Sequence, residues 1–292
     1  MRAYLEEFLC QNSYETEDIA TLLCAYDRVV ASPAAKQALD RALSLYEKDV
    51  TTPYEALSPC IEEMAEQSGV HPYTTGLLTF LCMTRHAERA FLEKGYSRAL
   101  FLDTMQDLRY QVAQCKAVKG VCGSFALSWL CGFFRLERFQ LGRLQFELIS
   151  FGKHYEKNGH TLTPDSTVIN VHIPRTGTPL RPAEVTAACE QAREFYRDRL
   201  GDSPAFACFS WLLWPKNAQI FSPESNIMRF AHRFDVFDSG IWGKDEDLWR
   251  LFDTDERNPD RLPADSSARR AYIAHLKAGG RTGWGHGVFF LD

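Results

Sequence analysis

The feature that most constrains this chain is a β-branched run that leads through a turn into a helix. Residues 168–173 alternate in the manner of a strand. Pro182 suits the first position of a helix, because no amide hydrogen is needed there, and Gly201 is a typical helix end. Residues 205–214 are almost continuously apolar, which is typical of a central strand buried on both faces. The stretch therefore predicts a strand–helix–strand unit, with a right-handed crossover as the default.

The turn between this strand and helix, residues 174–181, has the features of an anion site. A helix N-terminus presents unbonded amides and the positive end of the helix dipole, and both suit a phosphate. Gly177 would let the backbone approach a ligand closely, while Arg175 and Arg181 add positive charge. An ordinary turn with solvated arginines is the other interpretation, since short glycine motifs often match by chance.

Length and composition limit the classes of protein to which the chain can belong. A length of 292 residues predicts two domains, and 45% hydrophobic residues are enough for a core. The net charge of -5 gives no reason to expect a nucleic acid or a membrane as partner, and no apolar run reaches membrane-spanning length. The nine cysteines contain no Cys-x-x-Cys pair, which predicts reduced thiols in a cytoplasm and no metal site.

Helical patterns fill the first part of the chain. Ser32 followed by Pro33 is a capped helix start, and His71-Pro72 precedes a longer helix. Strand-like alternation is not seen in this part of the sequence. We therefore predict an all-helical N-terminal domain over residues 1–124 and a mixed domain over residues 125–292.

Strand patterns dominate the second part. Leu144, Phe146 and Leu148 fall on one face of a predicted half-buried strand over residues 139–148. Asn158-Gly159 is a typical two-residue hairpin turn. Three later segments are predicted as a strand or turn over residues 234–242, a charged surface excursion over residues 245–261, and a last strand over residues 288–291.

The order of these elements resembles the GNAT superfamily of acyl-CoA-dependent N-acyltransferases, and the chain looks like the two-domain N-acyltransferases of bacteria. The match rests on residues 141–147, on Val171-His172-Ile173-Pro174 followed by Gly177, and on residues 279–283 with the closing strand. The resemblance implies an α+β fold, in which a helical N-terminal domain precedes a GNAT-like mixed sheet flanked by helices. It also implies acetyl-CoA or another acyl-CoA as co-substrate and a small amine as acceptor, with a homodimer left open.

The resemblance further implies where coenzyme A would bind. In the superfamily, the turn after the fourth strand holds the pyrophosphate through a motif of the form Gln/Arg-x-x-Gly-x-Gly/Ala. The corresponding turn here keeps one arginine and one glycine, but the spacing differs and Pro179 lacks an amide donor. A later helix of the superfamily often starts near an Asn and carries a Tyr that protonates the thiolate; residues 230–234 contain no Tyr. The implied coenzyme A residues are Arg175, Thr176, Gly177, Thr178, Leu180, Arg181 and Asn226.

Amine acylation needs a base that takes a proton from an ammonium group. His172 is the first candidate, because it shares a strand face with Asn170 just before the turn and an imidazole suits this task near neutral pH. Glu147, on the polar face of its strand, is the second candidate. A structural histidine and a solvated carboxylate are the alternative interpretations. His286 lies among glycines, where the backbone would be open to a ligand, and is a further candidate.

Two functional hypotheses of different class follow. The first is an acyl-CoA N-acyltransferase, in which the amine attacks the thioester directly and no covalent enzyme intermediate forms. The second is a catalytically silent GNAT-like binding protein, which the altered turn and the missing Tyr favour. A hydrolase of the Gly-x-Ser-x-Gly type is disfavoured, since the chain has no such motif.

Overall fold

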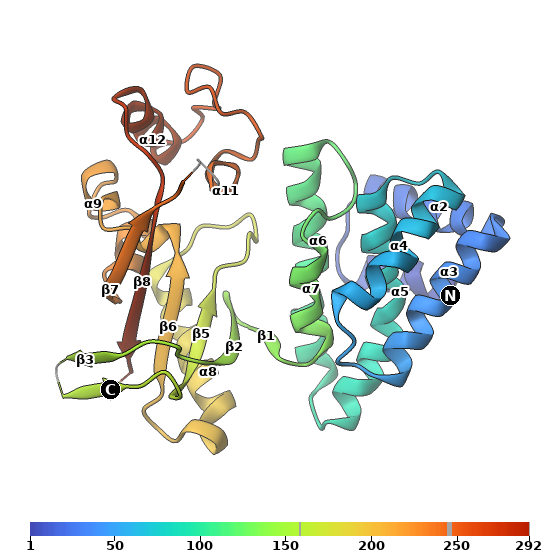
Figure 1. Cartoon of the computed structure of the whole chain (residues 1–292), viewed down its shortest axis with the longest axis horizontal. Coiled ribbons are helices and arrows are strands. Elements are labelled where there is room, and N and C mark those ends of the chain that lie inside the picture. Colours follow the sequence, from blue (N-terminus) through green and yellow to red (C-terminus); the bar gives the residue numbers. More distant parts are fainter. Residues whose placement is uncertain (158, 244–246, 292) are drawn as a thin grey trace. The chain divides into compact units, whose positions relative to one another are not determined.

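The computed structural model describes residues 1–157, 159–243 and 247–291. The chain divides into two compact units, residues 1–139 and 140–292. The first unit is built from helices and the second from a mixed sheet with flanking helices (Figure 1). The α+β fold class predicted from the sequence is confirmed.

The helical unit is organised around one long helix. α5 packs against each of the other helices of this unit, and its residues from Thr74 to Thr84 are all buried. This stretch is buried on every side because every side meets another helix. The helices are α1 (Arg2–Gln11), α2 (Thr16–Ala31), α3 (Pro33–Lys48), α4 (Tyr54–Ser68), α5 (Pro72–Glu93), α6 (Arg98–Lys119) and α7 (Leu127–Phe134).

The last helix of this unit packs closely on α5. A Cβ added at Gly76 of α5 would lie 2.2 Å from a methyl group of Leu127, the first residue of α7. Glycine at this position therefore lets the two helices approach each other. The sequence-based boundary between residues 124 and 125 lies before α7, whereas α7 groups with the helical unit in the structure.

The second unit contains a six-stranded sheet in the order β1-β2-β5-β6-β8-β7, together with the separate hairpin β3-β4. β5 and β6 are parallel, as the strand–helix–strand pattern predicts, while β2–β5, β6–β8 and β7–β8 are antiparallel. The strands are β1 (Arg138–Leu141), β2 (Leu144–Ser150), β3 (Tyr155–Lys157), β4 (His160–Leu162), β5 (Thr167–His172), β6 (Ala205–Ser210), β7 (Asp235–Ile241) and β8 (Gly283–Phe290). The helices are α8 (Pro182–Leu200), the 3₁₀ turn η1 (Trp211–Leu213), α9 (Asn217–Ile220), α10 (Asn226–Ala231), α11 (Leu248–Phe252) and α12 (Ser267–Lys277).

The structure corrects several element boundaries. The strand predicted over residues 139–148 is broken into β1 and β2 by a turn at Gly142, whose φ of +60° favours glycine. The apolar run after residue 205 stops being a strand at Ser210 and continues as η1. The segment predicted as a charged surface excursion contains α11, which buries Leu248 and Phe252 in an apolar cluster.

The predicted hairpin at Asn158-Gly159 is partly outside the described residues, because Asn158 is not among them. Its two strands are described, and Lys157 of β3 faces His160 of β4 in an antiparallel pair. The hairpin covers one end of a sheet face. Tyr155 and Leu162 join a buried cluster with Val168, Ala207 and Val288.

The glycines of β8 serve packing. Gly283, Gly285 and Gly287 share one face of the strand, and a Cβ on each would lie 2.2, 2.2 and 2.8 Å from Trp214, Leu213 and Phe234 respectively. The chain around η1 therefore rests directly on the β8 backbone. The expectation that this glycine stretch opens the backbone to a ligand is wrong on this face, because protein atoms fill it. His286 points to the opposite face and lies among the rings of Phe151, Phe209 and Phe237.

We expect the Gly285→Ala variant to lose about 1–3 kcal/mol of unfolding free energy, because the added methyl group would overlap the Leu213 carbonyl. Gly243→Ala is the matched control, since a Cβ there meets nothing within 4 Å. Urea unfolding of both variants measures the difference. Equal stability of the two would show that η1 does not press on β8.

Candidate functional site

A cluster of three polar side chains lies on neighbouring strands of the sheet. Glu147 of β2 stands opposite Asn170 of β5, and His172 is two residues further along the same face. His172 Nε2 lies 2.6 Å from Glu147 Oε1, and Asn170 Nδ2 donates to the same oxygen at 3.1 Å. The side chains of His172 and Glu147 are 20% and 15% exposed, so a ligand can reach them while most of each is out of solvent.

The contacts of the cluster favour one arrangement of protons. Glu147 Oε1 is an acceptor when its carboxylate is ionised, so both nitrogens directed at it act as donors. The proton of His172 is then on Nε2, and its Nδ1 carries the lone pair. A carboxylate that binds one ring nitrogen of a histidine fixes the tautomer and the ring orientation, and it stabilises the imidazolium that forms when the other nitrogen takes a proton.

The cluster lies where two strands separate. β5 and β6 pair at Ile169 with Phe206 and at Asn170 with Ala207, and their pairing ends there. Beyond that point β5 stays paired with β2 up to His172, while β6 stays paired with β8 up to Ser210. His172 of β5 and Phe209 of β6 each lie two residues beyond the last pair, Asn170 with Ala207, and on the same face of the sheet. The sheet thus opens between the candidate base and an exposed aromatic ring.

The turn over residues 174–181 is held in place by Arg143, which lies in the turn that connects β1 to β2. Arg143, between β1 and β2, donates to the carbonyl oxygens of Pro174 and Thr178, both at 3.1 Å. Gly177 has a φ of +79°, and a Cβ on it would meet nothing within 4 Å. Among the described residues, the Gly177 and Leu180 amides donate to no protein acceptor. The turn is therefore fixed in position while it keeps open space and amide donors.

The other predicted coenzyme A residues have protein partners in this structure. The guanidinium of Arg175 bonds to Asp253, which also accepts from Arg269 at 2.6 Å. Arg181, 66% exposed, pairs with Glu184 at 3.1 Å. The hydroxyls of Thr176 and Thr178 are 2.8 Å apart and bond to each other.

Asn226 is the first residue of α10, with Ser225 as the cap. α10 packs against α8, and Arg233, just beyond α10, donates to the Pro182 carbonyl at 3.0 Å. The helix that carries Asn226 is therefore attached to the helix that follows the turn. Leu180 is half-buried within the turn itself.

Sequence reasoning missed the residues that position this site. It placed Arg143 on the polar face of a continuous strand, whereas Gly142 before it marks a turn that aims Arg143 at residues 174–178. Asp253 and Arg269 were missed because they are 78 and 94 residues from Arg175 in the chain, and no local pattern joins them. Only the glycine at residue 142 was a readable signal.

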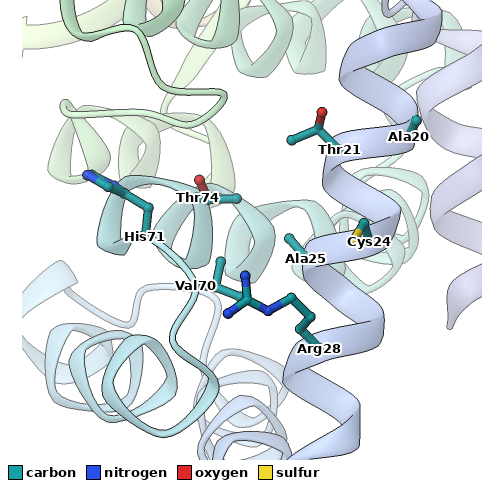
Figure 2. Close-up of a pocket in the computed structure, with 8 residues that line it drawn as sticks. All are labelled: Ala20, Thr21, Cys24, Ala25, Arg28, Val70, His71 and Thr74. Carbon is teal, nitrogen blue, oxygen red and sulfur yellow. The ribbon is translucent and has the colours of Figure 1, made fainter.

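A separate hollow lies in the helical unit, between α2 and the start of α5, with a volume of about 470 Å³ (Figure 2). Its polar groups are already engaged: Arg28 donates to the Ser68 and Gly69 carbonyls, and Thr74 to the Cys122 carbonyl. None of the sequence-predicted site residues belongs to it. The hollow is lined by Ala20, Thr21, Cys24, Ala25, Arg28, Val70, His71 and Thr74.

Within the described ranges, no three His, Cys, Asp or Glu side chains gather in a way that could hold a metal ion. Over the same residues, every helix is too short or too polar to cross a membrane.

Comparison with known families gives two adjoining matches. Residues 3–136 match the N-acyltransferase N-terminal domain, and residues 138–289 match the GNAT-like C-terminal domain. The chain belongs to this family of two-domain N-acyltransferases. The two-domain N-acyltransferase family read from the sequence is therefore confirmed, and the candidate cluster and turn both lie in the GNAT-like domain. No curated protein matches the chain.

Solved structures of acyltransferases share the fold of this family member. One, bound to decanoyl-CoA, is 22% identical with a TM-score of 0.73, and the match covers 98% of this chain and 87% of that one. A variant bound to octanoyl-CoA is 23% identical with a TM-score of 0.74 over the same shares. A third, in complex with decanoyl-CoA and teicoplanin, is 23% identical with a TM-score of 0.65 and 99% coverage of both chains.

We expect Arg143→Ala to loosen the turn, because two carbonyl groups lose a charged donor at once. Hydrogen exchange of peptides spanning residues 174–181 should become faster, and unfolding free energy should fall by about 1–3 kcal/mol. Arg181→Ala is the control from the same turn, since its exposed pair with Glu184 contributes little. Unchanged exchange in Arg143→Ala would mean that the turn holds its shape without this residue.

Proposed function

We propose that the chain transfers an acyl group from acyl-CoA to the primary amine of a small molecule. The observation that carries this proposal is the Glu147–His172 pair, at 2.6 Å, on the sheet face where β5 and β6 separate. A base in this position is close to a turn whose Gly177 and Leu180 amides can receive an anion. The two halves of the reaction, donor binding and amine deprotonation, thus have neighbouring candidates.

In this mechanism Glu147 holds the imidazole of His172 through Nε2, and Nδ1 takes a proton from the acceptor ammonium. The free amine attacks the thioester carbonyl carbon, the C–S bond breaks, and coenzyme A leaves as a thiolate that is then protonated. The products are an amide and coenzyme A. Asn170 keeps the Glu147 carboxylate in place through its amide, so we assign it a positioning role. Direct transfer needs no cysteine nucleophile, and burial raises the pKa of Cys189 to about 12, which makes its thiol inert.

The length of the transferred acyl chain is a separate part of this proposal. The family resemblance implies acetyl-CoA or another acyl-CoA as donor, and the similar solved acyltransferases hold octanoyl-CoA or decanoyl-CoA. We propose acetyl-CoA as the first donor and a medium-chain acyl-CoA as the second. A thermal-shift series from acetyl-CoA to decanoyl-CoA should raise the melting temperature most for the preferred donor, since ligands of the folded state stabilise it.

We place the reaction in the cytoplasm, where the nine free thiols would stay reduced.

Replacing Gly177 by valine should weaken acyl-CoA binding about tenfold or more, because a branched side chain would fill the space open to a phosphate. The positive φ would also strain the new residue. Gly201→Val is therefore the matched control, because Gly201 has a φ of +74° and equally open space outside the turn. Calorimetric titration of both variants with acyl-CoA measures the effect. Equal weakening in both would trace the loss to strain and would place the phosphate elsewhere.

Replacing His172 by glutamine should lower kcat by about a hundredfold or more, because glutamine can keep a hydrogen bond but cannot take the proton. Acyl-CoA binding should persist. The wild-type rate should also rise with pH as the imidazole becomes unprotonated, and the variant should lack this rise. Release of the coenzyme A thiol gives the rate, with His154→Gln, at an exposed residue, as the control. A variant that keeps the wild-type rate and pH dependence would make His172 structural.

A catalytically silent binding protein is the second candidate, and the bond between Arg175 and Asp253 favours it. That contact occupies the arginine that the sequence assigns to the phosphates. A silent protein would bind acyl-CoA without releasing its thiol in the presence of any amine. The same two assays, binding and thiol release, therefore separate the two functions.

A further inference from the structure

Arg175, in the turn proposed to bind the donor, is held by a carboxylate from another segment of the chain. Its guanidinium bonds to Asp253, and the two side chains are 35% and 20% exposed. Within the described ranges, Asp253 is the one acceptor bonded to this guanidinium. The contact is therefore better shielded from solvent than an ordinary surface pair, and it occupies a cation two residues before Gly177.

Asp253 presents its carboxylate from a fixed position. It follows α11 directly, and the last residue of that helix, Phe252, is buried in an apolar cluster. The Asp253 amide donates to the Trp249 carbonyl at 3.0 Å, which attaches its backbone to the helix. The carboxylate is therefore part of the folded scaffold, and its contact with Arg175 does not arise from an unanchored loop.

A second arginine shares the same carboxylate oxygen. Asp253 Oδ2 accepts from Arg269 at 2.6 Å as well as from Arg175, while Oδ1 is buried and has no hydrogen-bond partner among the described residues. Neither arginine thus forms the two-bonded pairing that makes an Arg–carboxylate contact strongest. Arg269 is held independently, by Asp265 at 2.9 Å and the Leu251 carbonyl at 2.8 Å. Asp253 therefore keeps a charged partner when Arg175 turns away.

The turn does not need the Arg175–Asp253 contact to keep its shape. Arg143 donates to the carbonyl groups of Pro174 and Thr178, which lie on either side of Arg175 in the chain. The Arg175 side chain can therefore change its partner while the backbone of the turn stays in position. A guanidinium suits this exchange, because its planar donors pair with phosphate oxygens as well as with a carboxylate.

We propose that Asp253 is an autoinhibitory residue of the donor site. It competes with bound coenzyme A for Arg175, so the diphosphate must displace this carboxylate to gain the guanidinium. The apparent affinity is then lowered to the fraction of molecules in which Arg175 is free, and the carboxylate assists release of coenzyme A by taking the guanidinium back. The inference rests on the proposed function for the identity of the ligand.

Calorimetric titration of the full chain with coenzyme A tests this contact. Asp253→Asn removes the charge but keeps the shape of the side chain, and it should tighten binding about tenfold. Asp265→Asn is the matched control, because it removes the same charge from a 68% exposed carboxylate that, in the described structure, bonds to Arg269 and not to Arg175. The control should stay within about twofold of the wild-type Kd.

A double-mutant cycle shows whether the effect acts through Arg175. In the Arg175→Ala background, Asp253→Asn should leave the Kd for coenzyme A unchanged, because the guanidinium for which both anions compete is gone. Urea unfolding checks that each variant is folded. The unaltered protein gives an independent measurement: coenzyme A should speed hydrogen exchange in peptides over residues 248–256, because Asp253 loses a bond there.

Weaker or unchanged binding by Asp253→Asn would overturn the inference, since the carboxylate would then orient Arg175 for the donor or have no effect on it. Equal tightening in Asp265→Asn would also overturn it, by tracing the effect to net charge. So would slower or unchanged exchange over residues 248–256, or an absence of coenzyme A binding in all these proteins.

The proposed function is measured separately, by release of the coenzyme A thiol from acyl-CoA in the presence of amines. A protein that shows the expected binding differences but releases no thiol would contradict acyl transfer and still support the role of Asp253. A protein that releases the thiol while Asp253→Asn leaves the Kd unchanged would keep acyl transfer and overturn the role of Asp253.

Discussion

The separation of β5 from β6 after two paired residues is the constraint on which the candidate site depends. On one side, Pro174 has no amide hydrogen and keeps Ile173 extended, so β5 follows β2 into the turn. On the other side, the Ser210 hydroxyl accepts from the Leu212 amide and starts η1, while β6 follows β8. Beyond this point β5 is still paired with β2 and β6 is still paired with β8, but β5 and β6 are no longer paired with each other. A sheet with continuous pairing here would bring His172 and Phe209 side by side and leave no opening between them.

The two faces of the sheet have different roles because they are covered differently. On the helix face, Phe206 stacks on Phe289 with centroids 4.7 Å apart, and Tyr196 of α8 donates to the Phe146 carbonyl. On the other face, the β3–β4 hairpin covers only one end, where Asp235 accepts from Tyr155 and Lys157. The polar cluster and the exposed ring of Phe209 both lie beyond this cover. Burial of half a face thus explains why polar and aromatic groups remain accessible together at the other end.

The turn after β5 shows which features of a candidate site a local sequence pattern can predict. Its glycine, its position before a helix and its two arginines are all readable in the sequence, and the structure places them as one turn. What those arginines contact was not readable, because Arg175 meets Asp253 from a segment far along the chain. The same holds for Arg143, whose side chain reaches the Pro174 and Thr178 carbonyls because a turn separates β1 from β2. Charge in a turn indicates a possible anion site, but the surrounding carboxylates decide how much of that charge is available.

The sequence by itself determined the fold class, the helical character of the first part and the parallel strand–helix–strand unit. These depend on periodicity, caps and turn residues, which act over a few neighbouring positions. It also identified His172 and Glu147 as candidate catalytic residues, without a contact between them. Only the tertiary structure decided that they meet at 2.6 Å, since residues 25 positions apart are joined by the register of β2 on β5. It also decided that the glycines around His286 pack against η1, and that β6 stops at Ser210. Register, strand breaks and packing depend on contacts between distant segments, and a sequence pattern carries no local record of them.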